Sequence, residues 1–204
     1  SLVISLAGAI AYLGFAAWQQ QQATALSIQV AADRGHEPGS LLLRPSFANT
    51  LLWRSAYRHQ GHWYIDAVRP GVFAEPAIYR GASVPVFYRP RDLPRIPVES
   101  RIGRDIRRLE HLSDGYLVWV SKVGASAGQL GDIRFSAVPT AAAPMWGLEF
   151  DPKRPDATPE WFVHRHLTPS MRQRFLDQLR GRVEDASKQR DAVSGKETDP
   201  ENEP

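Results

Sequence analysis

The sequence predicts an α+β domain in which two or three helices pack on a mixed or antiparallel β-sheet, preceded by an N-terminal transmembrane helix. Three observations lead to this: an uncharged apolar run at the start, short runs of β-branched and aromatic residues between turn residues, and later runs with helical periodicity. With 204 residues, the chain suffices for one domain with its own core. We divide it into a transmembrane segment 1–18, a connecting helix 19–35, an extramembrane domain 36–185 and a disordered tail 186–204.

The composition argues against two classes of interaction. Lysine plus arginine number 25 and aspartate plus glutamate number 22, so the net charge is only +3. Nucleic-acid-binding domains gather positive charge on one face, and we expect no nucleic-acid partner here. The chain contains no cysteine, which excludes disulfide bonds and metal sites built on thiolates.

The first eighteen residues are typical of the end of a membrane span. Leu2 to Trp18 carries no charge and is rich in Leu, Ile, Ala and Gly. As a helix it would be about 25 Å long, slightly shorter than the roughly 30 Å hydrocarbon core of a bilayer. The run starts directly at Ser1 and ends in a tryptophan, which favours the membrane interface. We therefore expect the last part of a transmembrane helix, with membrane lipid as a partner; the alternative is the buried core helix of a soluble protein.

The helix should continue beyond the membrane and pack against the domain. Ala23, Leu26 and Val30 are spaced to lie on one helical face. Arg34 is the only lysine or arginine in the stretch 19–38. By the positive-inside rule, so little positive charge after the span favours a non-cytoplasmic location for the domain.

The segment Arg44 to Tyr57 (RPSFANTLLWRSAY) predicts a turn followed by a strand. Pro45 disfavours a helix at this point, and Asn49 is typical of a turn. Trp53 is the expected core anchor of the strand. Arg54 follows it and is interpreted as a solvated neighbour, because a guanidinium group is costly to bury without partners.

Short strands and connections occupy much of the remaining chain. Gly61 lies in a polar link between two aromatic-rich runs, so a β-hairpin is expected there. Six prolines between Pro70 and Pro97 predict a meandering connection with short extended pieces such as Val84 to Tyr88. Composition then predicts four further strands, at Tyr116 to Val123, Gly131 to Val138, Met145 to Phe150 and Trp161 to His166.

Two amphipathic helices are expected within the domain. Ile102, Ile106 and Leu109 recur with helical spacing, and arginines occupy the other faces of that segment. These arginines are interpreted as a solvated face, with contact to anionic headgroups as the alternative. A second helix is expected from Pro169 to about Val183, with Thr168 as its N-cap.

No histidine pair stands out as a metal site. His59 and His62 lie in the expected hairpin turn without a third ligand of suitable spacing. His164 and His166 fall on one side of the last expected strand, where exposed polar residues at a sheet edge explain them better than a site does. We therefore expect this chain by itself to hold no transition metal and to contain no catalytic residues.

Three short motifs occur in the same order as in a known family. They are Pro45-x-Phe47-x-Asn49-x-x-Leu52-Trp53-Arg54, Gly131-Asp132-Ile133-Arg134-Phe135-Ser136 and Met145-Trp146-Gly147-Leu148. Following a membrane span, they resemble the C-terminal part of the YdjM-like family of bacterial inner-membrane proteins, which are assigned as metal-dependent hydrolases. The candidate site residues are the motif positions Asn49, Trp53, Arg54, Asp132, Arg134 and Trp146.

The resemblance implies a location and a function. In that family the histidines taken to bind the metal lie in the N-terminal membrane part. The chain would then be the soluble C-terminal domain of such a hydrolase, accessory to a site in the remaining transmembrane part and not catalytic alone. A divalent metal would belong to the full-length protein, located in the bacterial inner membrane with this domain on the periplasmic side. The alternative is a membrane-anchored, non-catalytic binding module of the bacterial envelope.

Strand alternation suggests a shared anion site. Arg54 and Arg134 each neighbour a large aromatic residue within an expected strand, so each arginine should lie on the face opposite that neighbour. If the aromatic residues face the core, both guanidinium groups lie on the outer face. There they could bind one anionic group together or pair with Asp66 or Asp132. The alternative is two exposed arginines in weak surface pairs.

Overall fold

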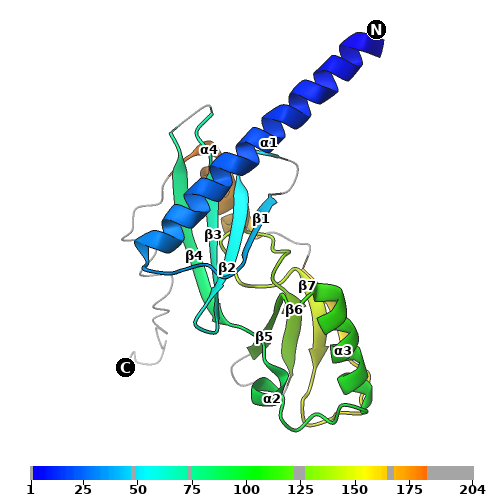
Figure 1. The fold of residues 1–204 in the computed structure, drawn as a ribbon. Helices are drawn as coiled ribbons and strands as arrows, with labels where there is room; N and C mark the ends of the chain where they lie inside the picture. The colour runs from blue at the N-terminus through cyan, green and yellow to red at the C-terminus, as the bar shows by residue number, and fades with distance from the viewer. Residues whose placement is uncertain (1, 47–48, 73–74, 122–126, 165–167, 183–204) are drawn as a thin grey trace, which may run out of the picture.

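The computed structural model describes residues 2–46, 49–72, 75–121, 127–164 and 168–182. Over these ranges the chain has the expected α+β fold, with two four-stranded antiparallel sheets and a long N-terminal helix (Figure 1). The first sheet has the strand order β1-β2-β3-β4 and the second β5-β6-β7-β8. In chain order the elements are α1 (Leu2–Asp33), β1 (Leu41–Pro45), β2 (Trp53–His59), β3 (His62–Arg69), β4 (Ala77–Pro85), α2 (Arg89–Asp92), α3 (Arg101–Ser113), β5 (Leu117–Ser121), β6 (Gly128–Asp132), β7 (Trp146–Phe150), β8 (Glu160–Val163) and α4 (Pro169–Arg180).

Each strand of the first sheet pairs with its neighbours in sequence. β2 and β3 are joined by a two-residue turn in which Gln60 and Gly61 have φ angles of 46° and 76°, and His59 pairs with His62. Positive φ at both central residues is characteristic of the tight turns that match the twist of paired strands. The predicted hairpin at Gly61 is therefore confirmed.

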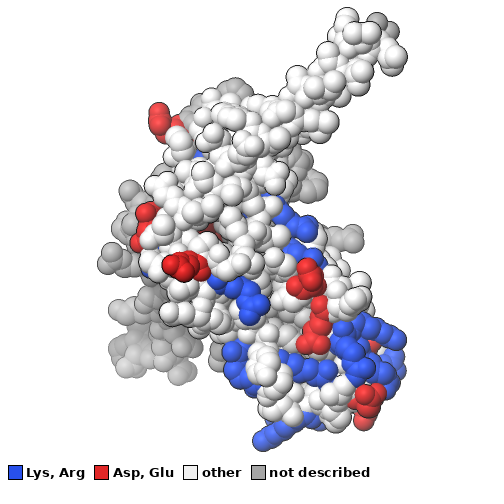
Figure 2. Space-filling view, viewed as in Figure 1, with Lys and Arg blue, Asp and Glu red and all other residues white. Residues whose placement is uncertain are grey.

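The first half of α1 projects from the domain. Every residue from Leu2 to Gly14 is exposed, and Figures 1 and 2 show this part as an uncharged rod pointing away from both sheets. By length and composition α1 could cross a membrane: its most apolar 18-residue window has a mean hydropathy of 1.6. Only 6% of that window is buried, so this half is not packed as a core helix.

The second half of α1 packs on one face of the first sheet. Ala23 lies in a buried cluster with Trp53 and Val68, and Leu26 packs against its margin. This confirms the predicted packing of the connecting helix against the domain. The positions that α1 buries recur at the spacing of one helical face: Gln19, Ala23, Ser27, Val30 and Ala31.

An ion pair fixes the C-terminal end of α1 to the same face. Nη1 and Nη2 of Arg34 donate to the two carboxylate oxygens of Asp66 at 2.6 and 2.7 Å, and the Asp66 side chain is only 1% exposed. Nη1 also donates to the hydroxyl of Tyr57 at 3.0 Å, and that hydroxyl lies 3.0 Å from Nδ1 of His36. Paired, two-pronged hydrogen bonds of this kind are among the strongest in proteins. Asp66 is thus the partner of Arg34 and pairs with neither Arg54 nor Arg134, for which it was one of two suggested acidic partners.

The surroundings of His36 favour its neutral form. Desolvation lowers the pKa of His36, and the neighbouring His59 and Arg34 lower it further; the His36 and His59 rings stack with centroids 4.0 Å apart. Because the Tyr57 hydroxyl accepts from Arg34, its own proton can be donated to Nδ1 of a neutral His36. Burial raises the pKa of Tyr57, so that proton is retained at neutral pH.

The opposite face of the first sheet is covered by α4 and by the segment that joins β6 to β7 (Figure 1). Phe175 and Leu179 of α4 pack on β3 and β4. Ile133 and Ala142 of the joining segment pack on β2 and β3. α4 begins at its predicted N-cap, Thr168. The first sheet is thus covered on both faces, and the joining segment connects it to the second sheet.

The second sheet packs against α3. Ile102, Ile106 and Leu109 of α3 are buried against leucines of β5, β6 and β7, as the helical periodicity predicted. The Oγ of Ser100 accepts the N–H of Gly103 and so caps the helix N-terminus. Four exposed arginines lie on the other faces of α3, and Figure 2 shows basic side chains gathered at this end of the molecule.

β1 was not predicted as a strand, and two further strands differ from the prediction. β4 is a nine-residue strand, Ala77–Pro85, where the prolines predicted a meandering connection. Pro76 precedes this strand and Pro85 ends it, so no proline interrupts its ladder with β3. β6 covers Gly128–Asp132 instead of Gly131 to Val138, because the Asp132 side chain accepts the backbone N–H of Arg134 at 2.8 Å and turns the chain out of the sheet.

The remaining predicted strands correspond to β5, β7 and β8. The first ends at Ser121 in the described structure, the second starts at Trp146, and the last is shorter than expected, covering Glu160–Val163. Phe47, His166 and the predicted tail 186–204 lie outside the described residues.

Candidate functional site

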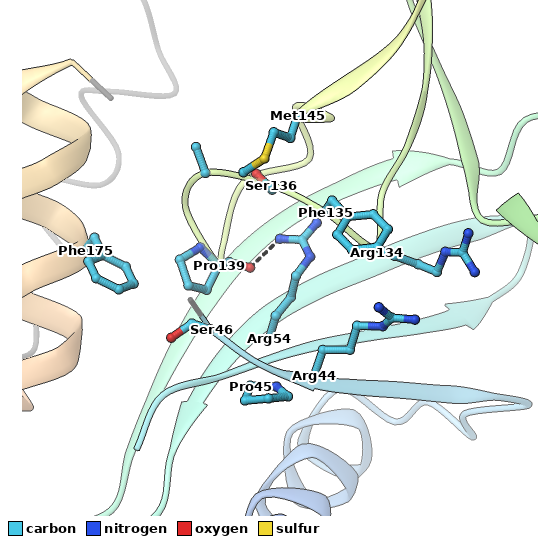
Figure 3. A pocket seen from close by; sticks show the side chains of 11 residues that line it. Arg44, Pro45, Ser46, Arg54, Arg134, Phe135, Ser136, Pro139, Met145 and Phe175 are labelled. Atoms are coloured by element: carbon cyan, nitrogen blue, oxygen red, sulfur yellow. Dashed lines mark hydrogen bonds between the residues drawn. The ribbon is translucent and has the colours of Figure 1, made fainter. Parts of the chain in front are cut away.

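A pocket of about 630 Å³ lies between the first sheet, the segment joining β6 to β7, and α4. Its size falls within the range of small-molecule binding sites. All three sequence motifs contribute to it, through Pro45 and Arg54, through Arg134 to Ser136, and through Met145. The complete lining, most of which is labelled in Figure 3, is Arg44, Pro45, Ser46, Arg54, Arg134, Phe135, Ser136, Ala137, Pro139, Met145 and Phe175.

Arg54 lies at the inner side of this pocket and is only 4% exposed. Its Nε and Nη2 donate to the carbonyl oxygen of Ile133 at 3.0 and 2.8 Å, and its Nη1 donates to the carbonyl oxygens of Pro139 at 2.5 Å and Val138 at 3.5 Å. Burial lowers the pKa of Arg54 to about 10, while the charge of Asp132 opposes that shift. The group is therefore charged at neutral pH and is held by neutral carbonyl oxygens.

Arg134 lines the same pocket and is paired with Asp132. Its Nε and Nη2 donate to the carboxylate oxygens at distances between 2.6 and 3.0 Å, and Nη2 also donates to the carbonyl oxygen of Leu112 at 2.9 Å. These hydrogen bonds to Asp132 raise the pKa of Arg134. The Asp132 side chain is fully buried. One of the two expected aspartate pairings is thus present, and it involves Arg134.

Arg44 adds a third positive charge and has no acidic partner among the described residues. Its guanidinium carbon lies 5.1 Å from the centroid of the Phe135 ring, within the range of a cation–π interaction. No hydrogen bond or ion pair joins its side chain to any residue in the described ranges. Its N–H donors are therefore available to an incoming acceptor.

The pocket has a basic side and an apolar side. Figure 3 shows Arg44 and Arg134 extending beside Phe135, with Phe175 of α4 at the opposite side of the pocket. Among the described residues, the three arginines of the lining and the Asp132 carboxylate paired with one of them carry two net positive charges. Guanidinium groups match the geometry of carboxylates and phosphates, so the arrangement is suited to binding an anion.

Neither Asp132 nor the other three candidate residues line the pocket. Asn49 caps the turn before β2, where its Oδ1 accepts two backbone N–H groups at 2.9 and 3.0 Å. Trp53 is buried against α1, as expected for a core anchor. Trp146 lies between Phe135 and Trp161, with ring centroids 6.2 and 6.1 Å away. These contacts give each of the three residues a role in the fold.

The expected outer-face position is wrong for Arg54. β2 does alternate, so Arg54 faces away from Trp53, but the segment after β6 covers that face and buries the arginine. Arg54 is therefore neither a solvated neighbour nor a member of a surface pair. Phe135 lies beyond the end of β6 and is 38% exposed, so strand alternation does not determine where Arg134 points. The two guanidinium groups nevertheless line one pocket.

The histidines singled out in the sequence do not form a metal site in the described ranges, where no three His, Asp or Glu side chains are placed to hold an ion. His59 stacks on His36. Nε2 of His164 lies 3.4 Å from Oε1 of Gln129. Each of these two histidines thus has a neighbour that accounts for its position.

Five residues of the pocket are not among those that the three sequence motifs specify: Arg44, Ser46, Ala137, Pro139 and Phe175. Arg44 directly precedes the first motif, which is a signal that could have marked it. In the sequence, Phe175 is recognisable only as an apolar position on a helix face. No neighbouring residue indicates that this face packs near the segment after β6. No protein-family model, curated protein or solved structure matches this chain. The pocket and the apolar helix are therefore the features from which a function can be inferred.

Proposed function

We propose that this chain is a membrane-anchored binding module whose pocket holds an anionic group between Arg44 and Arg134. The proposal rests on Arg44, whose charged guanidinium group lines the pocket and has no acidic partner in the described ranges. Asp132 occupies only Nε and Nη2 of Arg134, which leaves Nη1 of that guanidinium for a ligand.

Arg54 supports the same proposal through its charge. Its four hydrogen bonds to carbonyl oxygens use four of its five N–H groups, so direct contact with a ligand is limited. No carboxylate within the described residues accepts a hydrogen bond from it. Because a charge acts more strongly where water is excluded, this group favours an anion in the adjoining pocket.

α1 supports the anchored location. Its exposed, uncharged first half suits a bilayer, and its second half is packed against the sheet that carries Arg44 and Arg54. The pocket would therefore be held near the membrane. The bacterial inner membrane and the periplasmic side belong to the proposal through the family resemblance and the scarcity of basic residues after the apolar run.

Phosphate binding to the full chain tests the anion site. The protein would be placed in discs of zwitterionic phosphatidylcholine and titrated with inorganic phosphate at low ionic strength by calorimetry. Arg44→Ala should weaken binding by about tenfold, as expected when one charge-assisted contact is lost. Arg101→Ala removes the same charge from an exposed position on α3, away from the pocket lining, and should leave the affinity unchanged.

The comparison separates a site from general charge attraction. If Arg44→Ala and Arg101→Ala weaken phosphate binding equally, the anion is attracted only by net charge and the site does not exist. Absence of phosphate binding to the unaltered chain would also contradict the proposal. Thermal unfolding of both variants provides the check that each is folded.

A second candidate is the function implied by the family resemblance, an accessory domain of a membrane-bound metal-dependent hydrolase. It is favoured by the convergence of all three motifs on one pocket. The metal would then be held by the remaining transmembrane part, and this pocket would receive the anionic substrate. Reading the coding sequence upstream of Ser1 tests it: several apolar spans bearing histidines support the accessory role, and an initiator methionine directly before Ser1 contradicts it.

A further inference from the structure

The side of the pocket away from Arg44 and Arg134 is apolar. Phe175 comes from α4, and Met145 comes from the end of the segment that leads into β7 (Figure 3). Neither side chain is fully buried, so each presents apolar surface to the pocket. Besides Phe135, which lies beside the arginines, the apolar residues of the lining are Pro45, Ala137, Pro139, Met145 and Phe175.

The pocket is much larger than a small inorganic anion. A water molecule takes up about 30 Å³ of liquid, and a phosphate ion bound between two arginines would leave most of the roughly 630 Å³ unfilled. The unfilled part would be bordered by the apolar residues. A ligand that also covers this surface gains by removing it from water.

The pocket also lies close to the expected membrane surface. Leu26 of α1 packs in one cluster with Leu43 of β1, the residue that precedes Arg44, so α1 lies against the strand that carries Arg44 and Pro45. Leu26 is eight residues beyond Trp18, which corresponds to about 12 Å along the helix. A molecule that inserts an alkyl chain into the bilayer could therefore reach the pocket over a short distance.

We propose that the ligand of this pocket is an amphiphile, with an anionic phosphate head between Arg44 and Arg134 and an alkyl chain along Met145 and Phe175. This proposal rests on the anion site proposed above. It adds that most of the affinity comes from the chain, because each methylene group that enters the pocket strengthens binding by up to about fourfold.

Methionine methyl NMR measures chain contact directly. The chain contains only two methionines, Met145 in the pocket and Met171 on α4 outside the lining. The full chain would be labelled with ¹³C-methyl methionine and held in phosphatidylcholine discs. It would be titrated with inorganic, butyl, hexyl and octyl phosphate below their micelle-forming concentrations. The titration gives the affinity of each ligand, and the methyl signal that shifts shows where the alkyl chain lies. Met171→Leu assigns the two signals, and Met171 in the unaltered protein controls for effects of the amphiphile on the disc.

A longer chain should bind more tightly and shift the Met145 signal, while Met171 stays in place. Phe175→Ala should reduce the gain between butyl and octyl phosphate and leave the affinity for inorganic phosphate within about twofold, since Phe175 lies away from the basic side. Hexanol, which has the chain without the charge, should shift Met145 only at much higher concentration.

The outcomes distinguish this inference from the proposed function. If all four phosphates bind with equal affinity and Met145 does not shift, the amphiphile inference is wrong while the anion site stands. If none of them binds, both are wrong. Discs containing phosphatidic acid identify the source: a Met145 shift without added ligand indicates a bilayer lipid, and a shift only with soluble alkyl phosphate indicates a free amphiphile, either of which supports the inference.

Discussion

Nε and Nη2 of Arg54 both donate to the carbonyl oxygen of Ile133, across a separation of 79 residues in the sequence. This side chain joins β2 of the first sheet to the segment that leaves the second sheet after β6. Because Arg54 also lines the pocket, the same group supports the fold and contributes charge to the candidate site. The two roles can be separated, since Arg44 lines the pocket without comparable contacts.

Arg54→Ala should destabilise the protein strongly. The substitution leaves the buried carbonyl oxygens of Ile133 and Pro139 without their donors, and we expect a loss of about 3 kcal/mol in the free energy of unfolding. Arg44→Ala should change it by less than about 0.5 kcal/mol. Urea unfolding followed by tryptophan fluorescence measures both. Equal midpoints for Arg54→Ala and the unaltered protein would show that the carbonyl contacts contribute little.

Acidification should weaken the attachment of α1 through His36. The pKa of His36 is lowered from its ordinary value of 6.5, so between the two values the folded protein binds fewer protons than the unfolded chain. The stabilising effect of neutral His36 is therefore fully present above about pH 6.5 and is lost as the pH falls below it. Protonation at Nδ1 also removes the acceptor for the Tyr57 hydroxyl.

The His36→Gln variant isolates this contribution from other titrating groups. The difference in melting temperature between variant and unaltered protein should move in favour of the variant when the pH is lowered from 7.5 to 5. A difference that stays constant over this range would mean that His36 protonation is not linked to folding.

Gly81→Ala should disturb the junction between β4 and the segment joining β6 to β7. A β-carbon at this position would overlap the carbonyl oxygens of Ile65 and Thr140, and the next residue, Ala82, donates its N–H to Thr140 at 3.0 Å. We expect a loss of about 1–3 kcal/mol, typical of overpacking. Gly39→Ala is the control, since no atom lies within 4 Å of its β-carbon position. Equal melting temperatures of the two variants would contradict the close approach.

The exposed half of α1 should determine membrane association. The unaltered chain should remain in the membrane fraction without detergent. The double variant Leu6→Arg, Ile10→Arg should release it, because each arginine near the centre of a span costs about 2.5–3.5 kcal/mol. Ile28→Arg changes an exposed position on the packed half of the same helix and should not release it. Recovery of the unaltered chain in the soluble fraction would exclude the membrane interpretation.

Short sequence patterns predicted those helices and strands whose formation depends on residues close to one another in the chain. The buried face of α3 follows from the spacing of its isoleucines, and the start of α4 follows from Thr168 and Pro169. β4 could not be predicted as one strand from its proline content, because composition does not show that Pro76 and Pro85 fall at the strand ends. The burial of Arg54 and the pocket itself depend on a segment about 80 residues away. The three motifs identified several residues of the pocket, but the proximity of these residues depends on the tertiary structure.

The continuity of α1 has a consequence for the orientation of the domain. α1 is one continuous helix of 32 residues, from its exposed half to the half that is packed on the first sheet. The exposed half is therefore joined to the domain by helix and not by a flexible linker. Tilt or rotation of the exposed half would therefore change the orientation of the domain that contains the pocket. Each residue added to the helix between Trp18 and Ala23 would rotate the domain by about 100° and move it about 1.5 Å along the axis. If α1 is anchored in a bilayer as proposed, the length of this helix sets the direction in which the pocket faces relative to that bilayer.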